Sequence, residues 1–351
     1  MRGRGASYNT PNRFDKLHFE PLEIDLDPND PDDRPLKTIF LKDASKSVLS
    51  KNESPDIHFT YSINPYRGCE HGCIYCYARP SHEYLGFSAG ADFESKITVK
   101  ADAPELLAEA FQKKSWQPQM VCISGNTDCY QPVERKLQIT RRCLEVFLKF
   151  RNPVGIITKN ALIQRDLDIL IELAKLDLVS VTISVTTLDD ELTRIMEPRT
   201  STPAKRLETI EKLTAAGVPV YVLVAPIIPG LTDDQFPGIL KAVAARGAKS
   251  AGYTVVRLPG AVGPLFEDWL KRTMPDRAAK ILNRIRESHG GNADDTRWGK
   301  RMSGDGEFPA TIKKLFRIEC KRLGLNEEEF HVETKHFRRD GGKEKVQGEL
   351  F

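Results

Sequence analysis

The chain lacks any apolar run of the length that crosses a membrane. None approaches the ~20 residues that a spanning helix needs, although hydrophobic residues make up 40% of the 351. Residues 1–14 carry arginine but no apolar segment, so they are not typical of a secretory signal. We therefore expect a cytoplasmic protein without a membrane contact and with enough apolar residues for a real core.

Cysteine is scarce and unevenly placed, with seven in the chain and none before position 69. Three lie close together at Cys69, Cys73 and Cys76, in a C-x3-C-x2-C spacing. An odd number with such crowding indicates metal binding in a reducing compartment rather than a disulfide framework. Beyond Cys143 only Cys320 remains, so the sequence holds too few further thiols for a second cluster.

The chain has almost no excess of one charge sign, since its formal net charge is only +3. The charges are unevenly spread, however. Residues 20–33 carry seven acidic side chains and no basic one, whereas residues 271–322 carry fourteen Lys or Arg against seven Asp or Glu. The basic segment could attract a polyanion such as nucleic acid, or could form an ordinary solvated helical surface. Both interpretations stay open.

Hydrophobic patterning divides the chain into three parts. Residues 1–55 are polar and rich in Pro and Asp, which predicts an extended, partly disordered N-terminal arm. Over residues 56–263, short β-branched runs alternate with amphipathic stretches in six β-then-α units, and a further short strand is expected at 95–100. Residues 264–351 are predicted to form a basic helical C-terminal extension that begins with a long helical stretch over 264–288.

The six units favour one fold class. Strands that are apolar on both faces and alternate with helices are typical of a parallel sheet. Six consecutive units predict an α/β protein with a partial (β/α)6 TIM-like barrel, two units short of a complete one. Active sites of such sheets lie at the carboxyl ends of the strands, and the loop with three cysteines follows the first predicted strand. That loop is therefore expected at the functional end.

The crowded thiols leave the choice of metal open. Thiolates select zinc or an iron–sulfur cluster. A structural zinc site needs four ligands, and the candidates for a fourth are His71 and His82. A cubane cluster has iron at four corners, so three thiolates leave one iron open for chemistry. Gly68 and Gly72 would let the loop approach a cluster closely and adopt unusual dihedral angles.

The loop resembles the hallmark of radical S-adenosylmethionine (SAM) enzymes, C-x3-C-x-aromatic-C on the first βα loop. Over roughly residues 57–260, further segments are similar to the branch of that superfamily that is related to spore photoproduct lyase and described as DNA-repair-photolyase-like. These segments are 66–80, 124–134, 157–166, 184–187 and 224–233. The first residues, with GRGA and NRF, also resemble a subgroup of that branch.

The resemblance implies a set of cofactors and a reaction type. It implies a [4Fe-4S] cluster on Cys69, Cys73 and Cys76, SAM chelated by the open iron, and an external one-electron reductant of the flavodoxin or ferredoxin type. An electron from the cluster would cleave SAM to methionine and a 5′-deoxyadenosyl radical, for the repair or modification of nucleic acid. A protein or small-molecule substrate is the alternative within this class. The competing class is a non-enzymatic zinc-binding nucleic-acid module.

The resemblance also assigns residues to SAM. Thr127 would lie near its amino group, Asp128 near its ribose, Lys159 at its carboxylate and Ser184 at or near the ribose, while Tyr75 would pack against the adenine. A hydroxyl and a carboxylate at the end of a strand suit an ammonium group and a diol. Both residue types are also common at helix N-termini, so a structural role for Thr127 and Asp128 stays open.

Two tyrosines and one thiol are candidates for radical transfer. Tyr75 and Tyr77 flank the last cysteine of the loop, and the resemblance implies that they relay a radical, with plain packing as the alternative. The lyase has a hydrogen-donating cysteine at the position of Gly125, which has no side chain to donate. Either Cys122 or Cys129 could replace it, and Cys129 is the better placed, because Cys122 lies inside a predicted strand and would then matter only through packing.

Overall fold

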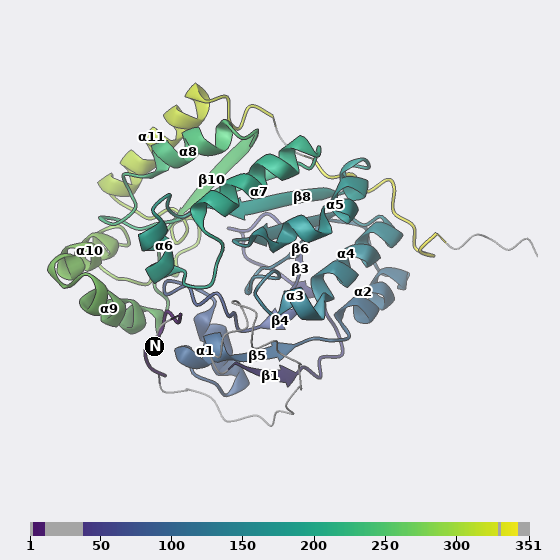
Figure 1. Cartoon of the computed structure of the whole chain (residues 1–351), viewed down its shortest axis with the longest axis horizontal. Coiled ribbons are helices and arrows are strands. Elements are labelled where there is room, and N and C mark those ends of the chain that lie inside the picture. Colours follow the sequence, from purple (N-terminus) through teal and green to yellow (C-terminus); the bar gives the residue numbers. More distant parts are fainter. Residues whose placement is uncertain (1–2, 11–37, 329–330, 343–351) are drawn as a thin grey trace, which may run out of the picture.

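The computed structural model describes residues 3–10, 38–328 and 331–342, and a curved, largely parallel sheet lies at its centre (Figure 1). The strand order across this sheet is β10-β9-β8-β7-β6-β3-β2. The parallel strands are β3 (Tyr61–Ile63), β6 (Val121–Ile123), β7 (Val154–Thr158), β8 (Val179–Ser184), β9 (Val220–Ile227) and β10 (Ser250–Val255). The short β2 (Ser50–Lys51) pairs antiparallel with β3 at one edge. The predicted parallel strands, in chain order, are confirmed.

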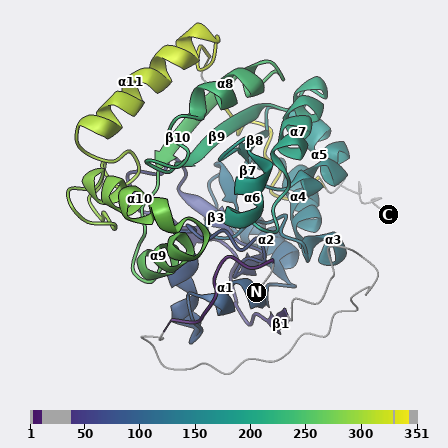
Figure 2. The same cartoon turned by 60° about the vertical axis from the view of Figure 1, so that its left-hand side comes forward.

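Helices cover the outer face of the sheet, as two views of the chain show (Figure 1, Figure 2). The longer ones between strands are α2 (Ala103–Gln112), α4 (Ile139–Phe150), α5 (Leu167–Ala174), α7 (Pro203–Ala215) and α8 (Phe236–Ala244). The short ones are η1 (Arg79–Leu85), α1 (Ala91–Ser95), α3 (Glu134–Leu137), η2 (Ala161–Asp166) and α6 (Asp190–Met196). The main apolar core lies between these helices and the sheet, where Phe111 packs edge to face against Phe147 and Phe150.

A smaller sheet with the strand order β1-β5-β4 lies beside the barrel (Figure 1). Its strands are β1 (Ile39–Lys42), β4 (Tyr66–Arg67) and β5 (Lys96–Val99). The extra strand predicted at 95–100 is therefore present, as β5. Both β1 and β2 come from the predicted N-terminal arm, of which residues 11–37 lie outside the described residues. The arm's boundary at residue 55 stays a prediction.

Among the residues described after β10, the helices are α9 (Val262–Thr273), α10 (Pro275–Glu287) and α11 (Glu307–Arg322). The long helical stretch predicted over 264–288 is split at Met274, because Pro275 has no backbone N–H and begins a new helix. The extension packs on the barrel through α11, where the ring of Phe316 lies 4.7 Å from that of Tyr253. Its predicted boundary at residue 263 is untested. In the part of the chain that is described, no helix is both long and apolar enough to cross a membrane.

The sheet curves without closing on itself. Within the described ranges β10 pairs only with β9, and β2 only with β3, so the two edges do not meet. The segment between α10 and α11 links the two sides of this opening. The amide of Val255 donates to the carbonyl of Met302 at 2.9 Å, and Arg301 pairs with Asp56, before β3, at 2.6 Å. The architecture is a partial TIM-like barrel, as the six-unit pattern predicts.

Candidate active site

The three predicted metal ligands lie on one loop between β4 and η1. Cys69 and Cys73 are buried and Cys76 is half-buried, and every cysteine of the chain is a free thiol. The three thiols are close enough for their charges to interact. Burial raises the pKa of Cys73 and of Cys76, so their thiolates need a nearby cation to form. An iron–sulfur cluster, in which thiolates ligate positive iron, fits this loop.

The histidines near the loop are not arranged to complete a zinc site. Among the residues described, no group of three or more His, Cys, Asp or Glu side chains could hold one metal ion. Burial alone would lower the pKa of His71, but Asp128 and the neighbouring thiol raise it to about 9. Both ring nitrogens already have a neighbour, since Nδ1 lies 3.4 Å from the Asp128 carboxylate and Nε2 lies 3.2 Å from the side-chain amide of Asn160. Burial lowers the pKa of His82 to about 4, and its ring lies between Phe87 and Phe93. Among the described residues, the loop and these histidines therefore do not form a ready-made zinc site.

Two glycines shape the cysteine loop. Gly68 and Gly72 have φ angles of +79° and +65°, in the left-handed region where a side chain is strained. A Cβ at Gly68 would lie 2.9 Å from the carbonyl oxygen of Phe93, and one at Gly72 would lie 2.9 Å from the carboxylate of Glu94. The unusual dihedral angles that the sequence suggested are present. The nearest atoms that a Cβ would meet at these two positions belong to α1, which packs against the loop.

The connection between α6 and α7 holds the cysteine loop from one side. The amide of Ile74 donates to the carbonyl of Met196 at 3.0 Å, and the amide of Arg199 donates to the carbonyl of His71 at 3.3 Å. The Arg199 guanidinium also pairs with the buried carboxylate of Glu70 at 2.8 Å. The positions of the thiols therefore depend on a segment more than a hundred residues away in the sequence.

Asp128 lies in the turn after β6, as predicted, and its carboxylate is engaged by the protein. It accepts hydrogen bonds from the hydroxyl of Thr158 at 2.7 Å and from the amides of Lys159 and Tyr130 at 2.8 and 2.9 Å. His71 Nδ1 lies 3.4 Å from it. Burial alone would raise the pKa of Asp128, but His71 and these hydrogen bonds lower it to about 2. The carboxylate thus ties the cysteine loop to the end of β7.

Thr127 and Ser184 are the other two predicted SAM contacts with hydroxyl groups. The Thr127 hydroxyl donates to the carbonyl of Tyr66 at 2.8 Å. Ser184 ends β8 with 2% of its surface exposed, and its carbonyl accepts a hydrogen bond from Arg206 at 3.1 Å. Both residues lie at the carboxyl ends of strands, where the sequence places them.

Lys159 and Tyr75 meet beside the cysteine loop. The Lys159 ammonium lies 6.0 Å from the centre of the Tyr75 ring. Within the described residues it makes no hydrogen bond and no ion pair. The Tyr75 hydroxyl donates to the carboxylate of Glu197 and lies 3.3 Å from the hydroxyl of Thr186. An unpaired cation next to a buried aromatic ring is therefore available to an anionic ligand.

A buried ion pair that the sequence did not reveal supports Tyr75. Glu197 follows α6, is 1% exposed and forms an ion pair with Arg206, which is equally buried on α7. Burial alone would raise the pKa of Glu197, but Arg206, Lys159 and Tyr75 lower it to about 2. The two residues are nine positions apart, which is not the three- or four-residue spacing of ion pairs on one helix, so no local sequence signal marks them as partners.

Tyr77 faces the opening of the barrel. Half of its surface is exposed, 52%, and its hydroxyl donates to the carbonyl of Gly125 at 2.5 Å. The Arg257 guanidinium, which no sequence motif singled out, lies 5.8 Å from the centre of the Tyr77 ring. A Cβ at Gly125 would lie 3.4 Å from the hydroxyl of Ser62, so the position has room for a small side chain. The departure from the lyase pattern at Gly125 is therefore not forced by crowding.

The structure places the two candidate thiols in different environments, with Cys122 within β6 and Cys129 in the turn that follows it. Cys129 has no exposed surface and lies in the core under the helices, together with Val121 and Ile123. Cys122, between those two strand residues, is not part of that core and therefore points to the concave face. The Cys122 thiol is close enough to the Tyr77 phenol for their charges to interact. Cys143 lies buried on α4.

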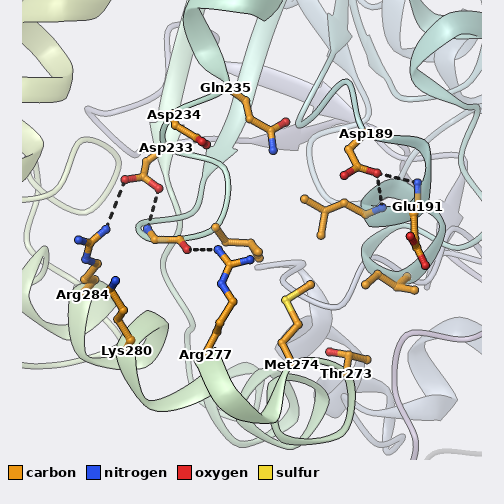
Figure 3. A pocket seen from close by; sticks show the side chains of 14 residues that line it. Asp189, Glu191, Asp233, Asp234, Gln235, Thr273, Met274, Arg277, Lys280 and Arg284 are labelled. Atoms are coloured by element: carbon orange, nitrogen blue, oxygen red, sulfur yellow. Dashed lines mark hydrogen bonds and ion pairs between the residues drawn. The ribbon is translucent and has the colours of Figure 1, made fainter.

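A hollow of the described chain lies away from these residues. One cavity of about 620 Å³ is bounded by α6, the turn after β9 and the start of α10 (Figure 3). Within it Arg277 donates to the carbonyl of Gly230 at 2.8 Å, and Asp233 lies 3.8 Å from Arg284. Acidic side chains in the turn after β9 thus face basic side chains of α10 across this cavity. None of the predicted site residues lines this cavity.

The fold and the site define a class of protein. The chain belongs to the radical SAM superfamily, which it matches over residues 63–243. That range contains the cysteine loop, the turn after β6, Lys159 and Ser184. Membership implies a [4Fe-4S] cluster, SAM and an external reductant, and it leaves the zinc-module alternative without support.

Relatives and solved structures agree with this class. Uncharacterized protein Rv2578c of Mycobacterium tuberculosis (strain ATCC 25618 / H37Rv) is 36% identical over 245 residues, 69% of this chain and 71% of that protein. Uncharacterized protein MJ0683 of Methanocaldococcus jannaschii is 29% identical over 200 residues, 57% of this chain and 72% of that protein. The structure of spore photoproduct lyase complexed with dinucleoside spore photoproduct has a TM-score of 0.58 at 15% identity, over 82% of this chain and 80% of that one. At this identity the likeness shows the fold.

Replacing Glu197 by Gln should lower the free energy of unfolding by about 3–5 kcal/mol near pH 7, because Arg206 loses its buried partner. The pKa of about 2 in the folded chain lies below the ordinary value of 4.5. The ionised carboxylate therefore stabilises the fold above pH 4.5, and this contribution is lost as the pH falls toward 2. Urea unfolding of the metal-free protein at several pH values measures the difference, and Glu211→Gln, at an exposed position of α7, is the control. A difference that stays constant with pH would contradict the ionised pair.

Proposed function

We propose that the chain is a radical SAM enzyme that reductively cleaves S-adenosylmethionine at a [4Fe-4S] cluster to a 5′-deoxyadenosyl radical. The observation that carries the proposal is the meeting of three free thiols, an unpaired ammonium group and a buried tyrosine beside one loop. The cluster, when bound, supplies one electron for the cleavage of SAM. Cys69, Cys73 and Cys76 would hold three irons and leave the fourth open to SAM.

Lys159 is the proposed partner of the carboxylate of SAM. Among the described residues its ammonium makes no hydrogen bond or ion pair, and the nearby Glu197 carboxylate is already paired with Arg206, so a carboxylate there gains a charge-assisted hydrogen bond. Tyr75 offers a ring face to the adenine next to that ammonium. Thr127 and Ser184 are proposed to contact the amino group and the ribose. Asp128 accepts hydrogen bonds on both oxygens, so we propose that it acts mainly by holding the backbone of Lys159.

Tyr75 and Tyr77 are proposed to carry the radical between SAM and the substrate. Tyr77 suits this role because its ring is half exposed at the opening and its hydroxyl lies on the β6 turn. Cys129 stays proposed as the hydrogen donor, although its burial requires the turn to open first. Cys122, on the concave face, is the second candidate. Product yields of Cys129→Ala and Cys122→Ala decide between them, since only the donor's loss should divert the product.

Nucleic acid is the proposed substrate class. The fold is that of a lyase whose structure holds a dinucleoside photoproduct. At the opening, the Arg257 guanidinium lies over the ring of Tyr77. The Arg301 guanidinium lies 4.0 Å from the ring centre of Trp298, which is exposed. Aromatic faces and guanidinium groups are the partners that bases and phosphates use in single-stranded nucleic acids. A protein or small-molecule substrate is the second candidate.

The cellular setting follows from the thiols and the cluster. All cysteines are free, and an enzyme that needs reduced thiolates suits a reducing compartment. We therefore propose that the enzyme works in the cytoplasm with a one-electron reductant of the flavodoxin or ferredoxin type.

Protein reconstituted without air should bind about four iron and four sulfide per chain, as one cubane requires. Each of Cys69→Ala, Cys73→Ala and Cys76→Ala removes a ligand and should abolish stable binding. Cys143→Ala, in the core at α4, should keep the cluster. Iron and sulfide assays with electron paramagnetic resonance measure this. Full iron content in all three ligand variants, or zinc as the only metal, would falsify the assignment.

Lys159→Ala should keep the cluster and weaken SAM binding by about tenfold to a hundredfold, because a charge-assisted hydrogen bond is lost. Equilibrium binding of SAM and the rate of 5′-deoxyadenosine formation by the reduced protein measure the effect. Lys205→Ala, on the exposed side of α7, is the matched control. Wild-type affinity in Lys159→Ala would remove this residue from the SAM site.

A short single-stranded oligonucleotide should bind the reconstituted protein, and Tyr77→Ala should raise its Kd by about tenfold, since stacking on an aromatic ring is worth roughly 1–3 kcal/mol per base. Tyr84→Ala, another exposed tyrosine, is the control. Fluorescence anisotropy at several salt concentrations also separates phosphate contacts from stacking. If neither single strands nor duplexes bind near 0.1 M salt, the substrate is a protein or a small molecule.

A further inference from the structure

The described N-terminal residues lie directly behind the cysteine loop, beside α1 (Figure 1). The amide of Gly5 donates to Glu94 Oε2 at 3.0 Å, and the amide of Ala6 donates to Glu94 Oε1 at 2.8 Å. Arg4 donates to the carbonyl of Glu94 and, at 3.0 Å, to the hydroxyl of Thr38. These residues belong to the GRGA motif, for which none of the proposed catalytic steps has a use.

The carboxylate that receives these amides is tied to the cysteine loop itself. Glu94 and Arg79 form an ion pair at 2.5 Å, with neither side chain exposed. Arg79 in turn donates to the carbonyl of Cys73 from two nitrogens, at 2.9 and 3.1 Å, and to that of Gly72 at 3.3 Å. A continuous chain of hydrogen bonds therefore runs from the backbone of Gly5 and Ala6 to the backbone of a predicted cluster ligand.

The N-terminal segment packs so closely against the rest of the chain that two of the contacting residues, Gly5 and Gly90, have no room for a side chain. A Cβ at Gly5 would lie 2.0 Å from the carbonyl oxygen of Gly72, inside the cysteine loop. On the other side, a Cβ at Gly90 would lie 2.1 Å from the carbonyl oxygen of Tyr8. Non-bonded heavy atoms do not lie this close together, so any Cβ would force the backbone to move. Both positions therefore require glycine.

Further contacts hold the rest of the segment in place. The side chain of Asn9 forms two hydrogen bonds with Asp92. It donates to the Asp92 carboxylate at 3.0 Å and accepts from the Asp92 backbone amide at 2.8 Å. The amide of Ala91 donates to the carbonyl of Tyr8 at 3.1 Å. Ser7 donates to Asp268 of α9 at 2.8 Å. The segment thus spans from the small sheet to the C-terminal helices across the back of the loop.

We propose that residues 4–9 are an integral wall of the cluster site and position the cysteine loop through Glu94 and Arg79. The inference rests on the proposed [4Fe-4S] site. A buried carboxylate stabilises its partner only while its lone pairs are satisfied, and the segment supplies two of the donors to Glu94. Without them the guanidinium loses its fixed partner, and the carbonyls of Gly72 and Cys73 lose the donor that orients them. The loop then holds iron less tightly, although every thiolate ligand is present.

The test is the full-length Gly5→Ala variant, which pushes the segment off Gly72 and leaves all ligands in place. After anaerobic reconstitution, iron should pass to a chelator roughly tenfold to a hundredfold faster than from wild type, as is typical when a group that orients metal ligands is lost. In the metal-free protein, the thiols of the loop should react faster with iodoacetamide. Gly238→Ala on α8, where a Cβ meets nothing within 4 Å, is the matched control.

A second variant tests the route of the effect. If the segment acts through the carboxylate, Glu94→Gln should also release iron faster, and the double variant should be little worse than either single one. Additive losses, or iron retention and thiol reactivity equal to wild type in Gly5→Ala, would overturn the proposal. Global unfolding of Gly5→Ala, seen by circular dichroism, would overturn it as well, because the segment would then support the barrel. A wild-type protein that binds no cluster refutes the proposed function instead, and the iodoacetamide rates still report on the segment.

Discussion

The geometry of the cysteine loop depends on one buried cation, the guanidinium of Arg79. It has no exposed surface and uses all three of its nitrogens, on the carbonyls of Gly72, Cys73 and Gly90 and on the carboxylate of Glu94. An ion removed from water costs several kcal/mol unless it is paired and fully hydrogen-bonded. The loop carbonyls therefore cannot move without leaving a buried charge unsatisfied, and this constraint fixes the backbone that carries the thiols.

A second buried pair fixes the other side of the site. Glu197 and Arg206 lie beyond Tyr75, and the Tyr75 hydroxyl donates to the same carboxylate that Arg206 neutralises. The cysteine loop thus lies between two buried ion pairs whose members come from distant parts of the chain. Lys159 is the cation left unpaired between them, within the described residues. A site built in this way is ordered before a ligand arrives, which lowers the conformational entropy that binding would otherwise lose.

Most of the fold was predictable because its signals are local. Alternation of β-branched runs with amphipathic stretches marks each strand and helix within about ten residues, so the parallel strands and β5 appear where they were expected. The split at Met274 also had a local signal in Pro275, and the prediction of one long helical stretch overlooked it. The site was harder to predict, because Glu197, Arg206 and Arg257 resemble ordinary surface charges until the fold buries them or turns them toward the opening.

The sequence by itself determined the thiol spacing, the order of the strands and the residues that follow each strand, since all of these are properties of short segments. Only the tertiary structure decided which charges are buried, which thiol faces the concave side of the sheet, and what the first residues contact. Those outcomes depend on pairs such as Gly5 with Gly72 and Ala6 with Glu94, which are far apart along the chain. No local pattern encodes such a pairing, because hydrogen bonding and close packing are decided by the neighbours that folding brings within a few ångströms.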